Sequence, residues 1–287
     1  MIEGVSSMAI GLAAALAATL LISGGLILQA VDARRVSRCH GLRLSLLARL
    51  LQRPWWILGT VIGYLAFPFQ LVALAHAPLI VVQPVHACGL LLVLAAGVRF
   101  LRERIGTPEL IGVATIVVGL GLVAWGAPTG NDPAISNAAL FSATGAMIAL
   151  ALVPFVLGER CGRMVLIFAA GLGFAAANLA VKGFSGELAA HHYLMAAMYM
   201  VATAIGSIAS LLTQMTAFQR HRAVEVVPIT FAVPIFLPVA VGMLVLHEHW
   251  ARAALAGGPF AVGAALLLAG TAAVTRSAPV CRMAHAA

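Results

Sequence analysis

The sequence is poor in charge. Only 9% of its 287 residues are Asp, Glu, Lys or Arg, whereas a soluble domain normally carries about 25%. Hydrophobic residues make up 62% of the chain, and the mean hydropathy is +1.05. So little charge excludes a water-soluble fold of this length, and so many large apolar residues exclude a disordered chain. The composition therefore predicts an integral membrane protein.

Lysine and cysteine are also scarce. One lysine and 16 arginines stand against nine acidic residues, which gives a net charge of +8. The basic residues lie in short gaps between apolar runs and form no long basic arm, so we predict no nucleic-acid partner. The four cysteines show no CxxC or Cys/His metal spacing. The sequence also has no nucleophile–base pair and no nucleotide-binding loop, and we predict neither an enzyme nor a cofactor or metal site.

Long apolar runs dominate the sequence. A helix needs about 20 residues to cross a bilayer core of roughly 30 Å, and strand-based membrane barrels need short alternating segments that are not found here. The first run follows Glu3 without a positive charge and is too long for a signal-peptide core, so we expect it to be retained. The prediction is an all-α polytopic membrane protein with nine transmembrane helices. They are expected at 5–30, 54–76, 79–98, 107–127, 135–157, 164–183, 193–217, 224–246 and 253–275.

The arginines predict the orientation of these helices. With nine spans, fifteen arginines fall on one side of the membrane, and only Lys182 and Arg252 fall on the other. The positive-inside rule then places the N-terminus outside and the C-terminus in the cytoplasm, in the plasma membrane. The stretch 31–53 is too polar to span. Its leucines recur at helical spacing between arginines, which predicts a short amphipathic helix on the cytoplasmic face; a disordered basic loop is the alternative.

The two halves of the chain share a pattern of spacings. Gln70 precedes Pro84 by 14 residues, and Gln214 precedes Pro228 by the same distance. A charged break and a glycine nine residues beyond it also recur at the same offset, which is about 144 residues. With nine spans, the matching helices run in opposite directions. Inverted repeats are a recurring architecture of secondary transporters, whose substrate site lies near the membrane midplane.

The repeat divides the chain into two parts. Residues 1–130 would hold four helices and the 31–53 segment, and residues 131–287 would hold five helices and a short cytoplasmic tail. The expected architecture is therefore a pair of inverted repeats of four and five helices.

Three segments carry a resemblance to a known family. They are ALAHAPLIVVQPVHACG (73–89), FLRERIGTPELIGVATIVVGLGL (100–122) and LVLHEHWARAALAGGPFAVGAALLLAG (244–270). In these segments the chain resembles the drug/metabolite transporter superfamily, the EamA-type fold. The shortened first half and the pair Trp55-Trp56 are most similar to NIPA-type magnesium transporters. The resemblance implies a transporter built from two inverted halves.

Polar residues inside apolar spans are the candidate site, because a charge at a helix centre costs roughly 2.5–3.5 kcal/mol on insertion scales. One stripe on the span 193–217 follows helical spacing. It would line a water-filled path, or it would serve close helix packing. The stripe comprises Tyr199, Thr203, Ser207, Ser210 and Gln214.

Further candidates lie on other spans. Lys182 is one turn beyond Asn178, where it would hold an anionic group or snorkel to the interface. Gln83 and His86 share a helix face, and His86 would either couple protons or remain a buried neutral side chain. Gln70 is the remaining polar candidate. Four prolines would break or bend helices and free backbone carbonyls for a substrate or water: Pro84, Pro228, Pro234 and Pro238.

These observations favour a secondary transporter or exporter of a small solute that works by alternating access. A NIPA-like divalent-cation transporter is the first alternative. A non-transporting scaffold or lipid-translocation partner is the second. Magnesium prefers carboxylate oxygens, and no acid lies in the middle of an expected span, so a neutral or anionic solute is at least as good a candidate. The expected partners are a small-molecule or ion substrate and membrane lipids, with a homodimer left open.

Overall fold

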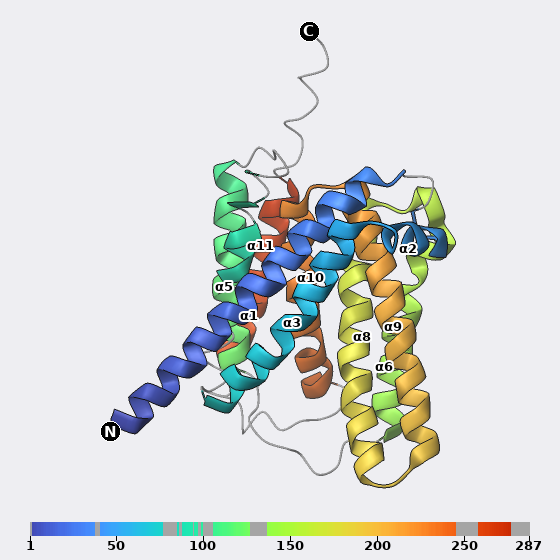
Figure 1. Cartoon of the computed structure of the whole chain (residues 1–287). Helices are drawn as coiled ribbons and strands as arrows, with labels where there is room; N and C mark the ends of the chain where they lie inside the picture. Colours follow the sequence, from blue (N-terminus) through green and yellow to red (C-terminus); the bar gives the residue numbers. More distant parts are fainter. Residues whose placement is uncertain are drawn as a thin grey trace.

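The computed structural model is helical wherever it describes regular structure (Figure 1). It describes residues 2–37, 41–76, 106–126, 137–244 and 258–276, together with 85, 88–93, 95–96 and 99. The prediction of an all-α protein is confirmed. The elements are α1 (Ile2–Arg35), α2 (Leu44–Leu50), α3 (Pro54–His76), α5 (Thr107–Gly126), α6 (Asn137–Ala151), α7 (Val153–Leu157), the 3-10 turn η2 (Gly158–Arg160), α8 (Arg163–Ala189), α9 (Tyr193–Arg220), α10 (Ala223–Leu244) and α11 (Gly258–Arg276).

Several helix ends differ from the expected runs. The helix α1 continues to Arg35, five residues into the stretch expected to lie outside the first helix, and its last turn carries two arginines that complement the helix dipole. The run 135–157 is divided between α6 and α7, because Pro154 stands in the first turn of α7 and cannot continue the hydrogen bonding of α6. Most of the expected span 79–98 lies outside the described residues.

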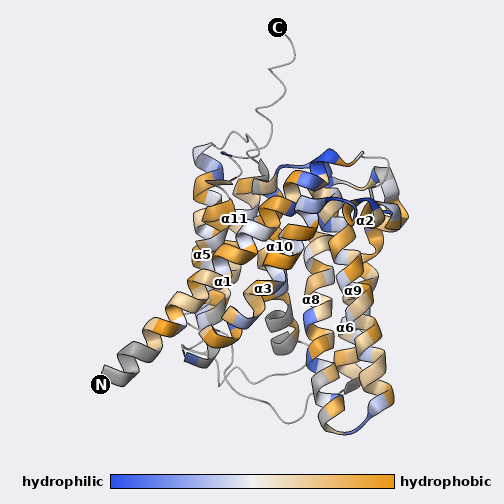
Figure 2. Ribbon diagram, in the orientation of Figure 1, coloured by the Kyte–Doolittle hydropathy of each residue, from blue (hydrophilic) through white to orange (hydrophobic). Residues whose placement is uncertain are grey.

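The composition and length of the helices are those of a membrane-embedded protein. Among the described residues, five helices are long and apolar enough to cross a membrane. Three shorter apolar helices lie at Thr107–Val123, Glu225–Leu237 and Gly258–Val274. Figure 2 shows apolar colours along the helix shafts and the deepest hydrophilic colours at the end of the bundle where α2 lies. Large apolar side chains are exposed on these shafts, as expected where lipid replaces water.

Within the described residues, contacts between two glycines bring helices together in three pairs. In the α1–α3 pair, a Cβ on Gly25 would lie 2.5 Å from the carbonyl oxygen of Gly59. In the α8–α9 pair, a Cβ on Gly173 would lie 2.8 Å from the carbonyl oxygen of Gly206. The helices α5 and α11 pack in the same way. At such distances only glycine lets the two backbones touch, which is a common packing device of membrane helices.

One end of the bundle gathers the ends of several helices and is named the arginine-rich end. Nη2 of Arg34, at the end of α1, lies 3.4 Å from the carbonyl oxygen of His221, just beyond α9. Nε2 of Gln219 donates to the carbonyl of Val36 over 3.3 Å. The helix α2 lies at this end, away from the 190–192 turn between α8 and α9 (Figure 1).

Two ion pairs tie further helices together at the arginine-rich end. Arg222 contacts Glu109, near the start of α5, at 2.6 Å. Arg163, the first residue of α8, contacts Glu225 of α10 at 3.2 Å. Both carboxylates are buried, and a buried carboxylate that lost its partner would be strongly destabilising. The starts of α5, α8 and α10 are therefore joined at one end.

A candidate solute cavity

A cavity of about 720 Å³ lies inside the bundle. This volume is in the range of small-molecule sites. Its walls come mainly from α1, α3 and α10, with contributions from α5, α8 and α9. Every lining residue that the structure describes is uncharged. The polar lining residues are Thr19, Ser23, Gln29, Thr60, Tyr64, Gln70, Asn178, Gln214 and Thr230.

The α1–α3 pair forms the first polar wall. Nε2 of Gln29 donates to Oγ1 of Thr60 over 3.0 Å. The Thr60 hydroxyl in turn donates to the carbonyl of Trp56 over 2.9 Å, one turn earlier in α3. A hydroxyl has one proton and two lone pairs, so Thr60 can donate and accept at the same time. This chain of bonds fixes the amide of Gln29 at the cavity wall.

The second polar wall comes from α9 and α10. Gln214 is 3% exposed, and its Nε2 lies 3.5 Å from Oγ1 of Thr230. Pro234 also lines the cavity and stands one helical turn beyond Thr230. Because proline has no amide hydrogen, it cannot donate to the Thr230 carbonyl as a helical residue normally would. Thr230 therefore offers a hydroxyl bonded to Gln214 and a carbonyl without its helical donor.

Trp56 closes the cavity toward the arginine-rich end. The side chain is buried, and its indole Nε1 donates to Sδ of Met215 over 3.3 Å. Its backbone N–H donates to Oδ2 of Asp32 over 3.0 Å. Farther from that end, the lining residues Tyr64 and Asn178 are exposed. The accessible part of the cavity therefore lies away from the arginine-rich end.

The structure brings together four of the residues chosen from the sequence. Gln70, Asn178, Gln214 and Pro234 come from four different helices and all line this cavity. Gln70 is half-buried, which leaves its amide accessible. Their common position makes this cavity a polar region inside a mostly apolar bundle.

The rest of the α9 stripe does not line the cavity. Tyr199 is buried edge-on against Phe141, with ring centroids 5.6 Å apart. The hydroxyl of Thr203 donates to the carbonyl of Tyr199, and the hydroxyl of Ser210 donates to the carbonyl of Ala170 in α8. These bonds satisfy the hydroxyls within the helix packing. Ser207 is half-buried and is also outside the cavity lining.

The remaining candidates are elsewhere or cannot be placed. Lys182 is exposed on α8, one turn beyond Asn178, and does not line the cavity. The helix α10 runs as one element through Pro228, Pro234 and Pro238. Three candidates lie outside the described residues: Gln83, Pro84 and His86.

Sequence reasoning missed six polar residues of the cavity wall: Thr19, Ser23, Gln29, Thr60, Tyr64 and Thr230. They lie in three expected apolar spans: Thr19, Ser23 and Gln29 at 5–30, Thr60 and Tyr64 at 54–76, and Thr230 at 224–246. A weak signal was present, since Gln29 and Thr60 are polar residues in the first two spans. Only the packing of α1 on α3 brings them into contact.

Comparisons with protein-family models, with curated proteins and with solved structures gave no match. The residues and geometry of this cavity are therefore the basis for a functional inference.

Proposed function

We propose that this chain is a secondary transporter of a small uncharged solute across the plasma membrane, working by alternating access. One observation carries the proposal. Amides and hydroxyls from both parts of the chain meet in a single cavity inside an apolar helical bundle. Because polar groups inside a membrane are costly, their convergence on one cavity favours a solute path.

The closure of the cavity supports alternating access. Trp56 separates it from the arginine-rich end, where the two buried ion pairs hold helix starts together. Exposed lining residues lie on the other side of Trp56. A transporter must open each side of its site in turn, so these contacts are the ones that would separate in the opposite state.

Glycine spacings support the proposed inverted repeat. The contacting glycines of the α1–α3 pair, Gly25 and Gly59, are 34 positions apart, and those of the α8–α9 pair, Gly173 and Gly206, are 33 apart. The described helices also overlap eight of the nine expected spans, one of which is divided between α6 and α7. We therefore propose nine spans in two inverted repeats, with a drug/metabolite transporter architecture, an external N-terminus and a cytoplasmic arginine-rich end.

The lining favours one class of solute. The amides and hydroxyls can donate and accept hydrogen bonds, and Trp56, Phe174 and Phe231 add aromatic surface. This combination suits an uncharged polar solute with a flat apolar part. A dehydrated magnesium ion prefers carboxylates, and the described lining offers only neutral groups.

Flux into liposomes tests the proposal. The purified chain would be reconstituted and exposed to a mixture of neutral, anionic and cationic metabolites, with magnesium as a separate arm. We expect selective uptake of neutral solutes. Gln214→Leu and Thr230→Val should each lower uptake about five- to tenfold, the effect of losing one hydrogen bond in the loaded cavity.

Ser207→Ala is the matched control, because Ser207 lies on the same helix as Gln214 but outside the lining. Its uptake should equal that of the unmodified chain. Uptake that is unchanged in both cavity variants contradicts the proposed site. Magnesium uptake without solute uptake contradicts the proposed substrate class.

A further inference from the structure

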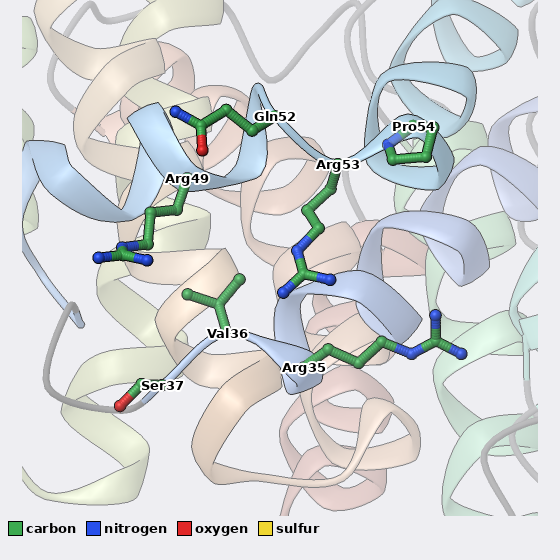
Figure 3. A pocket seen from close by; sticks show the side chains of 7 residues that line it. All are labelled: Arg35, Val36, Ser37, Arg49, Gln52, Arg53 and Pro54. Carbon is green, nitrogen blue, oxygen red and sulfur yellow. The ribbon is translucent and has the colours of Figure 1, made fainter.

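A second pocket, of about 640 Å³, lies at the arginine-rich end, where α1 ends and α2 leads into α3 (Figure 3). Three of its lining residues are arginines. Figure 3 shows Arg49 and Arg53 reaching toward the end of α1 on either side of Val36, while the head of Arg35 points the other way. Gln52 lies between Arg49 and Arg53 in the sequence and also lines the pocket. The pocket is thus basic, and it shares no lining residue with the solute cavity.

The positive charge of this pocket is only partly compensated. Arg35 lies 3.6 Å from the buried carboxylate of Asp32. Arg49 and Arg53 are exposed, and within the described residues neither contacts a carboxylate. Pro54 also lines the pocket and begins α3, whose positive dipole end adds to the field. Two guanidinium groups with a neighbouring amide match the charge and hydrogen-bonding pattern of a phosphate.

Apolar side chains beside the pocket favour a lipid as the source of such a phosphate. The helix α2 buries Leu46 and Leu50 in the bundle core but leaves Leu44 exposed at 68%. Leu51 and Trp55, on either side of the 52–54 pocket residues, are exposed at 55% and 52%. Leucine and tryptophan in this arrangement are typical of segments that lie in the membrane interface. A phosphate bound here would therefore have acyl chains next to it.

We propose that this pocket binds the phosphate of an anionic phospholipid headgroup, held by Arg49 and Arg53. The site is separate from the solute cavity, and its occupation does not depend on transport. A bound headgroup would join the end of α1, the helix α2 and the start of α3 through one ligand. It would also hold α2 against the membrane face.

Native mass spectrometry of the full chain in detergent tests this site. The chain would be titrated with phosphatidylglycerol and, in parallel, with zwitterionic phosphatidylcholine. We expect tighter binding of phosphatidylglycerol. The double variant Arg49→Gln/Arg53→Gln should lose about a hundredfold of that affinity, at roughly tenfold for each charge-assisted contact. Inorganic phosphate in excess should not displace the lipid.

The matched control is Arg43→Gln/Arg160→Gln, which removes two exposed arginines from the same end without altering the pocket lining. It should lose less than about fivefold, the share of general surface attraction. Equal losses in the two double variants, or equal binding of both lipids, overturn the proposal. Displacement by inorganic phosphate overturns the lipid assignment. The unfolding midpoint without lipid confirms that both variants are folded.

Discussion

Gly119 of α5 and Gly263 of α11 contact each other through their backbones. A Cβ on Gly119 would lie 2.9 Å from the carbonyl oxygen of Gly263, and a Cβ on Gly263 would lie 2.7 Å from that of Gly119. The two residues are about 144 positions apart, the offset that relates the halves of the sequence. Equivalent residues meet each other only beside a two-fold axis. The contact is therefore the one expected of the proposed inverted repeat if its axis runs between α5 and α11.

The glycine contact predicts a loss of stability on the smallest enlargement. Gly119→Ala should lower the free energy of unfolding by about 1–3 kcal/mol, because a backbone carbonyl cannot move aside without shifting its helix. Thermal unfolding in detergent, monitored by size-exclusion chromatography, measures this loss of stability. Gly145→Ala in α6 is the control, since a Cβ there meets nothing within 4 Å. Equal midpoints for the two variants would show that α5 and α11 are not in backbone contact.

The ion pair between Glu109 and Arg222 gives a second prediction. Glu109 is buried and also accepts the N–H of Gly106 at 2.7 Å. Removing one partner of a fully buried pair costs about 3–5 kcal/mol. Arg222 is 29% exposed, so we expect about 2 kcal/mol for Glu109→Gln after solvent screening.

Unfolding midpoints of Glu109→Gln, Arg222→Gln and the double variant form a thermodynamic cycle for this pair. The double variant should lose less than the sum of the single variants. Arg160→Gln, an exposed arginine at the same end, is the control and should change little. Strict additivity in the cycle would mean that the two residues do not interact.

The proposed topology predicts opposite accessibility at the two ends of the bundle. In a chain freed of its native cysteines, Arg43→Cys next to α2 and His191→Cys in the α8–α9 turn are both at exposed positions. An impermeant maleimide applied to intact cells should label His191→Cys, and Arg43→Cys should react only after permeabilisation. Labelling of both positions before permeabilisation contradicts the nine-span arrangement.

Cys161, in the junction between η2 and α8, predicts a pH dependence. Burial raises the pKa of its thiol above the ordinary value, and the nearby Arg220 offsets only part of this shift. Because the thiolate is the reactive form, maleimide labelling should be slow at neutral pH. The labelling rate of Cys161 should rise at a higher pH than that of Arg160→Cys, an exposed neighbouring position. The same pH profile for both thiols would contradict the raised pKa of Cys161.

The same shift has a consequence for stability. A raised pKa means that the folded chain holds the Cys161 proton more tightly than the unfolded chain does. The associated stability is present below the unfolded pKa and is lost as the pH rises through the folded pKa. Unfolding midpoints of the chain and of Cys161→Ser should therefore converge as the solution becomes alkaline.

The sequence predicted the helices better than their contacts. The expected run 54–76 has the same bounds as α3, because membrane helices follow from apolar length alone. Which faces pair does not follow from length. The GxxxG pattern of Gly59 and Gly63 indicates a face suited to close packing, but the sequence does not show that Gly25 of α1 is the residue that packs there.

The candidate site could be predicted only in part, because the sequence does not show which helix faces pair. The polar stripe lies on the helix α9, as predicted from its spacing. Its members have different surroundings, however, because Gln214 lines the cavity and Ser210 donates to a carbonyl of α8. Helical spacing reports which residues share a face and is silent about what the face meets. The bond between Gln29 and Thr60 needed the packing of α1 on α3 to become visible.

The bond from the Trp56 amide to the carboxylate of Asp32 bears on how the protein is made. An amide in the first turn of a helix has no partner within that helix, and here α1 supplies the acceptor that α3 lacks. During synthesis α1 leaves the ribosome first, so the acceptor is already in place when α3 enters the membrane. The two helices thus form a helical hairpin in which a side chain of α1 satisfies a backbone amide in the first turn of α3. We therefore expect replacement of Asp32 to weaken the pairing of α1 with α3 during insertion.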